Sequence, residues 1–206
     1  MRESNYELTK RKMQTEFLRY DQAEMIQKFS LAADERYLYL TLLRRPHRID
    51  RCSGLVEWSD DCFRTAHEAD FNSAMTLYDL LCCSKPDCRL SGRFCTVNAL
   101  RGTAYTAGLG EDLFVREAAF FDRHLTQLRA ACAALGGTQE PNGDLACRLF
   151  LFPFFPVILR FWQGDEEFPA SLKLLWDENT LQFLHYETTY YAANHLFSRL
   201  RAACRD

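Results

Sequence analysis

Residues 145–162 constrain the fold more than any other stretch, because they carry the strongest strand pattern in the chain. In their first half, apolar side chains alternate with other residues, which is typical of a strand with one buried face. Pro153 and Pro156 each remove a backbone N–H that a sheet ladder would use, so the strand must break or bulge there. Residues 157–162 resume an extended pattern, and residues 171–176 follow as a returning strand.

Much of the remaining chain shows the spacing of apolar residues that is typical of helices. Ser4, Asp21 and Asp70 each stand where a side-chain oxygen can cap the start of a helix. The clearest helical pattern runs from Phe114 to Leu135, where apolar residues recur in alternating steps of four and three. We predict one unbroken helix there with its apolar edge buried, and a further helix near the C-terminus.

The order of these elements predicts an α+β fold, with a mainly antiparallel sheet and several helices packed against it. The chain has 206 residues, of which 48% are hydrophobic and 26% are charged. A chain of this size can bury a core without help from a metal or a disulfide. No linker divides the sequence, so we predict a single α+β domain over residues 1–206.

The net charge of −3 argues against a protein that binds nucleic acid by neutralising phosphates. No apolar run approaches the roughly 20 residues of a membrane helix, and the first residues lack the apolar core of a signal peptide. We therefore expect a cytoplasmic protein that binds neither nucleic acid nor membrane. The sequence contains no dinucleotide fingerprint, Walker loop or HExxH motif. It thus specifies no cofactor, and it defines neither a partner nor an oligomeric state.

The nine cysteines are an odd number, which fits free thiols in a reducing compartment better than a disulfide framework. Four of them, Cys82, Cys83, Cys88 and Cys95, lie close together in the sequence. Their spacing matches neither the pairs of a zinc site nor the runs of an iron–sulfur site. Adjacent helical residues such as Cys82 and Cys83 also point about 100° apart. We predict that these thiols are structural and bind no metal, and keep a metal or redox role as the alternative.

Residues 153–170 read PFFPVILRFWQGDEEFPA, the least generic passage in the chain. This motif resembles an uncharacterised prokaryotic family, the domain-of-unknown-function family 3786, found largely in anaerobes. The segments LYDLL at residues 77–81 and SG at residues 91–92 also resemble that family. Some relatives are joined to iron–sulfur modules, so the resemblance implies an accessory role in anaerobic redox or cofactor metabolism. It brings no established catalytic residues.

The acids beside Gly164 are the first candidates for a functional site. Clustered carboxylates can hold Mg²⁺ or Ca²⁺, or can keep one acid protonated for general acid chemistry; the alternative is a solvated hairpin tip. We expect Asp165 or Glu166 to be partly buried, with a partner from the Arg148–Arg160 region or the closing helix, since an arginine inside an apolar strand needs a carboxylate. The ligand-binding candidates are Asp165, Glu166, Glu167, Arg160, Trp162 and His185.

From the sequence we predict a small-ligand-binding or accessory protein whose site lies near the GDEEFP motif, because no catalytic constellation is visible. One alternative is an enzyme or metal-dependent protein that uses Asp165, Glu166 and Glu167, together with His185. Another is a thiol-based metal or redox accessory protein of anaerobic metabolism. Catalytic residues are not specified by the sequence, and enzyme status stays open.

Overall fold

The computed structural model describes residues 4–103 and 111–204, which form helices and two antiparallel five-stranded sheets. The α+β expectation is therefore confirmed, with two sheets where one main sheet was expected. The helices are α1 (Asn5–Phe17), α2 (Gln22–Phe29), α3 (Phe71–Cys83), α4 (Glu111–Asp122), α5 (Leu125–Ala134) and α6 (Tyr186–Ala203), with short 3₁₀ helices η1 (Val97–Ala99) and η2 (Thr180–Gln182). None of the described helices is long and apolar enough to cross a bilayer.

The first sheet is a meander, in which each strand pairs with the next one along the chain. Its strands are β1 (Ala32–Ala33), β2 (Tyr37–Leu42), β3 (Arg45–Asp50), β4 (Val56–Trp58) and β5 (His67–Glu68). The tight turn between β2 and β3 places Leu43 and Arg44 at φ values of 48° and 61°, the left-handed region that two-residue hairpin turns require. The buried Leu43 donates its backbone N–H to the carbonyl of Leu151 at 2.8 Å, which joins this sheet to the second one.

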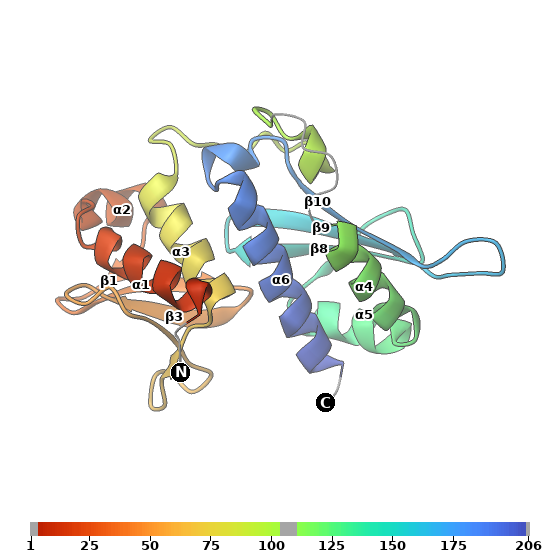
Figure 1. Cartoon of the computed structure of the whole chain (residues 1–206), viewed down its shortest axis with the longest axis horizontal. Coiled ribbons are helices and arrows are strands. Elements are labelled where there is room, and N and C mark those ends of the chain that lie inside the picture. Colours follow the sequence, from red (N-terminus) through yellow and green to blue (C-terminus); the bar gives the residue numbers. More distant parts are fainter. Residues whose placement is uncertain (1–3, 104–110, 205–206) are drawn as a thin grey trace.

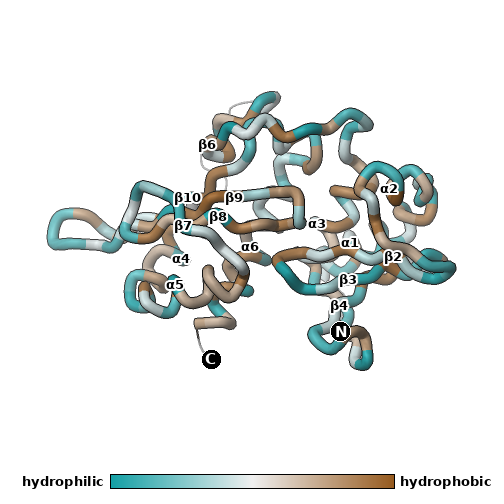
Figure 2. The backbone as a smooth tube through the Cα atoms, turned by 180° about the vertical axis from the view of Figure 1, so that it is seen from behind, coloured by the Kyte–Doolittle hydropathy of each residue, from teal (hydrophilic) through white to brown (hydrophobic). Residues whose placement is uncertain are grey.

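The second sheet has the order β6-β10-β9-β8-β7 and contains the apolar motif at its centre. Its strands are β6 (Phe94–Thr96), β7 (Thr138–Gln139), β8 (Leu145–Phe152), β9 (Phe155–Trp162) and β10 (Ser171–Asp177). The predicted break is present, because β8 and β9 are joined by a turn at Pro153 and Phe154, and their register shifts between Phe150 and Phe152. Pro156 is tolerated in β9 opposite Phe150. Figure 2 shows apolar residues along β8 and β9.

Three helices begin at the predicted caps. The Ser4 hydroxyl accepts a hydrogen bond from the backbone of α1, and the carboxylates of Asp21 and Asp70 do the same for α2 and α3. Each cap satisfies an N–H that has no partner within the helix. The C-terminal helix is α6, which packs between α3 on one side and α5 on the other (Figure 1). The buried apolar residues of both sheets and of all these helices form one continuous core.

The prediction of one helix from Phe114 to Leu135 is wrong, because α4 ends at Asp122 and α5 begins at Leu125. His124 leaves the helical conformation with φ of −136°, and its ring packs on Phe120 at 4.4 Å between ring centres. The protonated Nδ1 of His124 donates to the Phe120 carbonyl at 2.7 Å. The imidazole therefore uses the Phe120 carbonyl, which would accept the backbone N–H of His124 in a continuous helix. This competition favours the end of the helix. The apolar spacing continues across the break, so periodicity alone could not reveal it.

Candidate functional site

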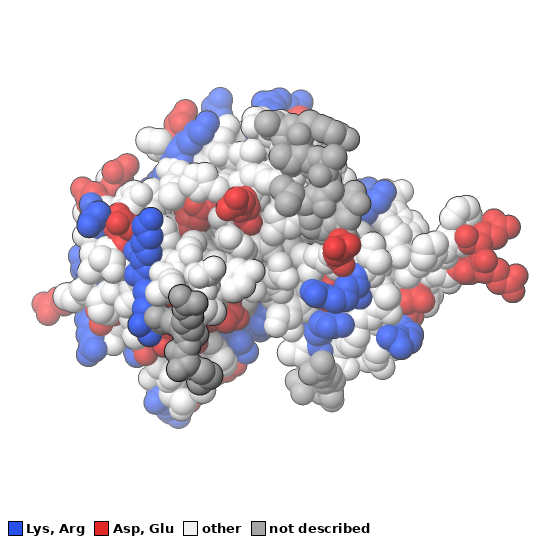
Figure 3. Space-filling model, in the orientation of Figure 1, with Lys and Arg blue, Asp and Glu red and all other residues white. Residues whose placement is uncertain are grey.

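The predicted acidic residues lie on a loop that projects from the end of the second sheet. Asp165, Glu166 and Glu167 are all exposed in the connection between β9 and β10, and Figure 3 shows acidic side chains at its tip. Asp165 Oδ1 accepts hydrogen bonds from the backbone of Glu167 and Phe168 at 2.9 and 2.8 Å. The hydrogen bond from Phe168, and then the one from Glu167, lower the pKa of Asp165. The expectation that one of these acids is partly buried is therefore wrong.

The two strand arginines do not meet these acids. Arg148 pairs instead with Glu140 from the β7–β8 connection at 2.6 Å. Arg160 lies in the middle of β9, and its buried Nε has no hydrogen-bond partner in the described part of the chain. The turn is closed locally, because Asp165 donates its N–H to the Phe168 carbonyl at 2.9 Å. The loop that carries the three acids projects away from the end of the second sheet (Figure 1).

The two other ligand-binding candidates are also separated from the loop acids. Trp162 is half-buried at the end of β9, where the Lys173 ammonium lies 5.5 Å from its ring centre. His185 is the residue before α6 and makes no capping hydrogen bond with its side chain. The start of α6 lies at the top of Figure 1, while the β9–β10 loop lies at its right edge. The structure thus does not assemble the predicted candidates into one site.

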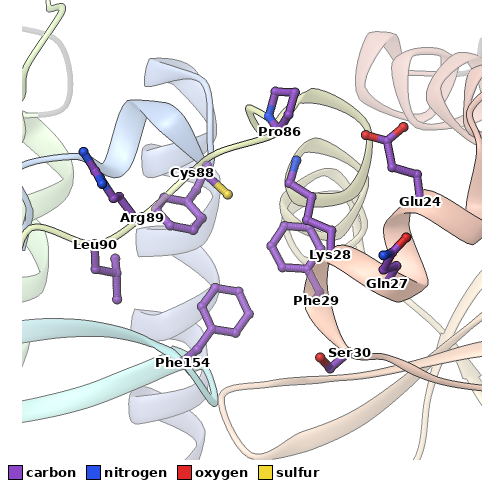
Figure 4. Close-up of a pocket in the computed structure, with 11 residues that line it drawn as sticks. Glu24, Gln27, Lys28, Phe29, Ser30, Pro86, Cys88, Arg89, Leu90 and Phe154 are labelled. Atoms are coloured by element: carbon purple, nitrogen blue, oxygen red, sulfur yellow. The ribbon is translucent and has the colours of Figure 1, made fainter.

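The motif of residues 153–170 does contribute to a cleft, but through the turn at its start and not through its three acids. A cleft of about 630 Å³ lies between the end of α2, the segment 86–90 and the turn that joins β8 to β9 (Figure 4). This volume is within the range of small-molecule sites in proteins. Phe154, at the tip of the β8–β9 turn, forms one wall.

Aromatic rings form the apolar part of this cleft. Phe29 and Phe154 stack with their ring centres 5.5 Å apart and their planes 13° apart. The ring centre of Phe183 lies 6.1 Å from that of Phe154, and Phe183 lines the same cleft. A second cavity of about 360 Å³ shares Phe29, Ser30 and Phe154 with the first. The Phe29–Phe154 stack is therefore a common wall, and it remains partly exposed because Phe154 keeps 37% of its surface open to solvent.

Lys28 places a positive charge at the mouth of the cleft. Its Nζ donates to the carbonyl and to the hydroxyl of Ser84 at 2.6 and 2.7 Å, which leaves one N–H of the ammonium group free. Within residues 4–103 and 111–204, Lys28 makes no ion pair, although Glu24 lies one helical turn away and also lines the cleft. Arg89 lines the cleft as well, but its guanidinium group extends outward in Figure 4.

A separate polar cluster joins the end of α3 to the start of α6. Asp79 is almost fully buried, and its Oδ1 lies 2.6 Å from Nδ1 of His185, while its Oδ2 accepts the His185 backbone N–H at 2.7 Å. Cys83 lies one turn after Asp79 on α3. One ligand atom from each residue lies within 4.8 Å of the other two, and no other such group of three metal-ligating side chains occurs in the described residues.

This cluster does not have the arrangement of a thiol nucleophile. Burial, followed by the Asp79 charge, raises the pKa of Cys83 to about 12, so the thiol is protonated at neutral pH. A nucleophilic cysteine needs a base that accepts its proton. Here the Asp79 carboxylate is hydrogen-bonded to Nδ1 of His185, and the same carboxylate contacts the Cys83 thiol.

The four clustered cysteines do not form a ligand set together. Cys83 alone among them belongs to the three-residue group described above. Burial raises the pKa of Cys82 to about 12 and also raises that of Cys88 and Cys95. Cys88 lines the aromatic cleft. Asp79 and Cys83 stand four residues apart on the helix predicted after Asp70, and this spacing, which places both on one face, is the signal that could have indicated the cluster.

The fold and its sites define an α+β protein with an aromatic, lysine-bearing cleft and a nearby Asp–Cys–His cluster. A family model described as a domain of unknown function (DUF3786) matches residues 21–199. The chain therefore belongs to this family, as the resemblance of its sequence motif indicated. Neither a curated protein nor a solved structure matches the chain.

Proposed function

We propose that the protein binds a small organic anion with a flat apolar body in the cleft between α2 and the β8–β9 turn. The apolar body would lie against Phe29, Phe154 and Phe183, and the negative group would accept a hydrogen bond from Lys28. The observation that carries the proposal is the Lys28 ammonium group, held by Ser84 beside stacked aromatic rings without a carboxylate partner in the described chain.

Physical chemistry favours this pairing of groups. A half-buried ammonium beside apolar walls is less hydrated than one in open solvent, so a charge-assisted hydrogen bond to an anion there is stronger. Phe29 and Phe154 offer a face for a planar ring, and stacking of aromatic rings adds to the free energy gained by burying their area. Lys28 is already fixed by two hydrogen bonds, so binding a ligand costs little additional side-chain entropy.

The test uses two fluorescent probes of similar shape, anilinonaphthalene sulfonate (ANS), which is an anion, and N-phenylnaphthylamine, which is neutral. Both should bind the cleft saturably. Lys28→Gln should lower the affinity for ANS roughly tenfold, equivalent to about 1.4 kcal/mol. It should leave the affinity for the neutral probe unchanged, because only the charge interaction is lost. Phe154→Ala should lower the affinity for both probes.

Two matched controls lie outside the cleft. Lys173 also holds its ammonium group over an aromatic ring, that of Trp162, and Phe168 is an exposed phenylalanine on the β9–β10 loop. Lys173→Gln and Phe168→Ala should leave the affinity for both probes unchanged. The proposal fails if these controls weaken binding as much as the cleft variants do, or if neither probe binds saturably.

A further inference from the structure

We propose that Asp79, Cys83 and His185 form a binding site for a divalent transition-metal ion of the zinc class, with a fourth position open to water. This site is distinct from the proposed ligand cleft. It would tie the C-terminal end of α3 to the first turn of α6.

Local structure sets the three side chains together. Asp79 and Cys83 are four residues apart on α3, which places them on the same face of the helix. His185 is fixed by its backbone N–H bond to Asp79 Oδ2 at 2.7 Å, and its Nδ1 lies 2.6 Å from Asp79 Oδ1. In a tetrahedral zinc site, ligand atoms lie roughly 3.3–3.7 Å from one another. A small opening of the Asp79–His185 contact would therefore admit an ion between atoms that already converge within 4.8 Å.

The charge on Asp79 also calls for a cation. Its side chain is only 7% exposed, and in the described part of the chain its one ion-pairing partner is His185, with no lysine or arginine within 4.0 Å. A buried carboxylate needs a compensating positive charge. A bound divalent ion would supply it. On binding, the thiol proton of Cys83 would pass to solvent, and His185 would coordinate through an unprotonated Nδ1 with its ring proton on Nε2.

The donor atoms select the class of metal. One sulfur, one imidazole nitrogen and one carboxylate oxygen suit zinc and similar borderline ions, whereas Mg²⁺ and Ca²⁺ prefer oxygen ligands alone. The His185 side chain is 69% exposed, so water can reach the remaining coordination position. Three protein ligands with an open position are typical of zinc sites that perform chemistry, while structural zinc sites use four protein ligands.

The test adds Co²⁺ to the full chain, stripped of metal by a chelator under anaerobic conditions. Cys52 and Cys62 are exposed and would bind metal at the surface, so both are first replaced by serine. Addition of one equivalent of Co²⁺ should produce a thiolate-to-cobalt charge-transfer band and the visible bands of a four-coordinate ion, and one equivalent of Zn²⁺ should remove both.

Variants assign these bands to residues. Cys83→Ser should abolish the charge-transfer band, and His185→Ala should weaken Co²⁺ binding by at least the roughly 10–100-fold that loss of an outer-shell partner costs. The imidazole of His185 is the ion-pair partner of the buried Asp79, so both metal-free variants are compared with the parent protein by circular dichroism, and the assignment rests on the variant that keeps its fold. The matched control is Cys82→Ser, which removes the neighbouring thiol and should change neither band. The proposal is overturned if no band forms at one equivalent, if Cys82→Ser removes the band, or if His185→Ala binds Co²⁺ unchanged.

Discussion

His47 shows how one buried residue links the fold to pH. Its side chain is fully buried on β3, and its protonated Nδ1 donates to the Arg45 carbonyl at 2.9 Å. Its buried Nε2 has no hydrogen-bond partner among the residues that the structure describes. Burial therefore lowers the pKa of His47 from 6.5 to about 4, since a protonated ring would place an unpaired charge in the core.

We predict that the free energy of unfolding falls as the pH is lowered from 6.5 toward 4, because the unfolded chain then binds a proton that the folded chain does not. The loss from His47 should be about 2 kcal/mol at a pH of about 5. Denaturant unfolding at several pH values measures it. His47→Gln should flatten the dependence, and the exposed-residue control His67→Gln should not. An equal slope in both variants would show that another group is responsible.

At the scale of elements, the pair α4 and α5 shows where periodicity is sufficient and where it is not. The sequence predicted helix on both sides of His124, and the buried face is largely as expected. It could not predict that the His124 ring would bond the Phe120 carbonyl and end α4, because that contact depends on a rotamer rather than on a pattern. The candidate site was missed for a similar reason. Lys28 and Phe154 are far apart in the sequence, and only the packing of α2 beside the β8–β9 turn brings them to one cleft.

The helix break has an energetic consequence. Leu128 is fully buried in the middle of α5, whereas Leu125 is half-buried at its first position. Leu128→Ala should cost about 2–5 kcal/mol of unfolding free energy, as expected for a buried leucine that leaves a cavity. Leu125→Ala should cost clearly less, because part of its surface is already in water. Equal losses in denaturant unfolding would favour the continuous helix that the sequence predicted.

At the scale of the whole molecule, strand contacts and helix packing join the two sheets. The Leu43 N–H bonds the Leu151 carbonyl across the sheets, and α6 packs against both α3 and α5. The buried apolar residues on either side belong to one continuous core. That residues 1–206 are a single domain stays a prediction, and a single domain would unfold as one cooperative unit.

Tryptophan fluorescence can measure this cooperativity in each half. Trp58 lies on β4 of the first sheet, and Trp176 lies in the core on β10 of the second. The third tryptophan, Trp162 on β9, is replaced by phenylalanine in both reporters. Variants that then retain only Trp58 or only Trp176 should unfold at the same denaturant midpoint once each is corrected for its own stability by circular dichroism. Two midpoints within one variant, one by fluorescence and another by circular dichroism, would indicate two separately folding units.

The central claim is that the aromatic cleft beside Lys28 receives an organic anion, and a crystal structure of the protein with bound ANS tests it most directly. We predict that the sulfonate lies within hydrogen-bond distance of Lys28 Nζ and that the naphthalene ring lies against Phe29 or Phe154. An ANS molecule bound elsewhere on the surface, with the cleft between α2 and the β8–β9 turn left free of it, would contradict the account.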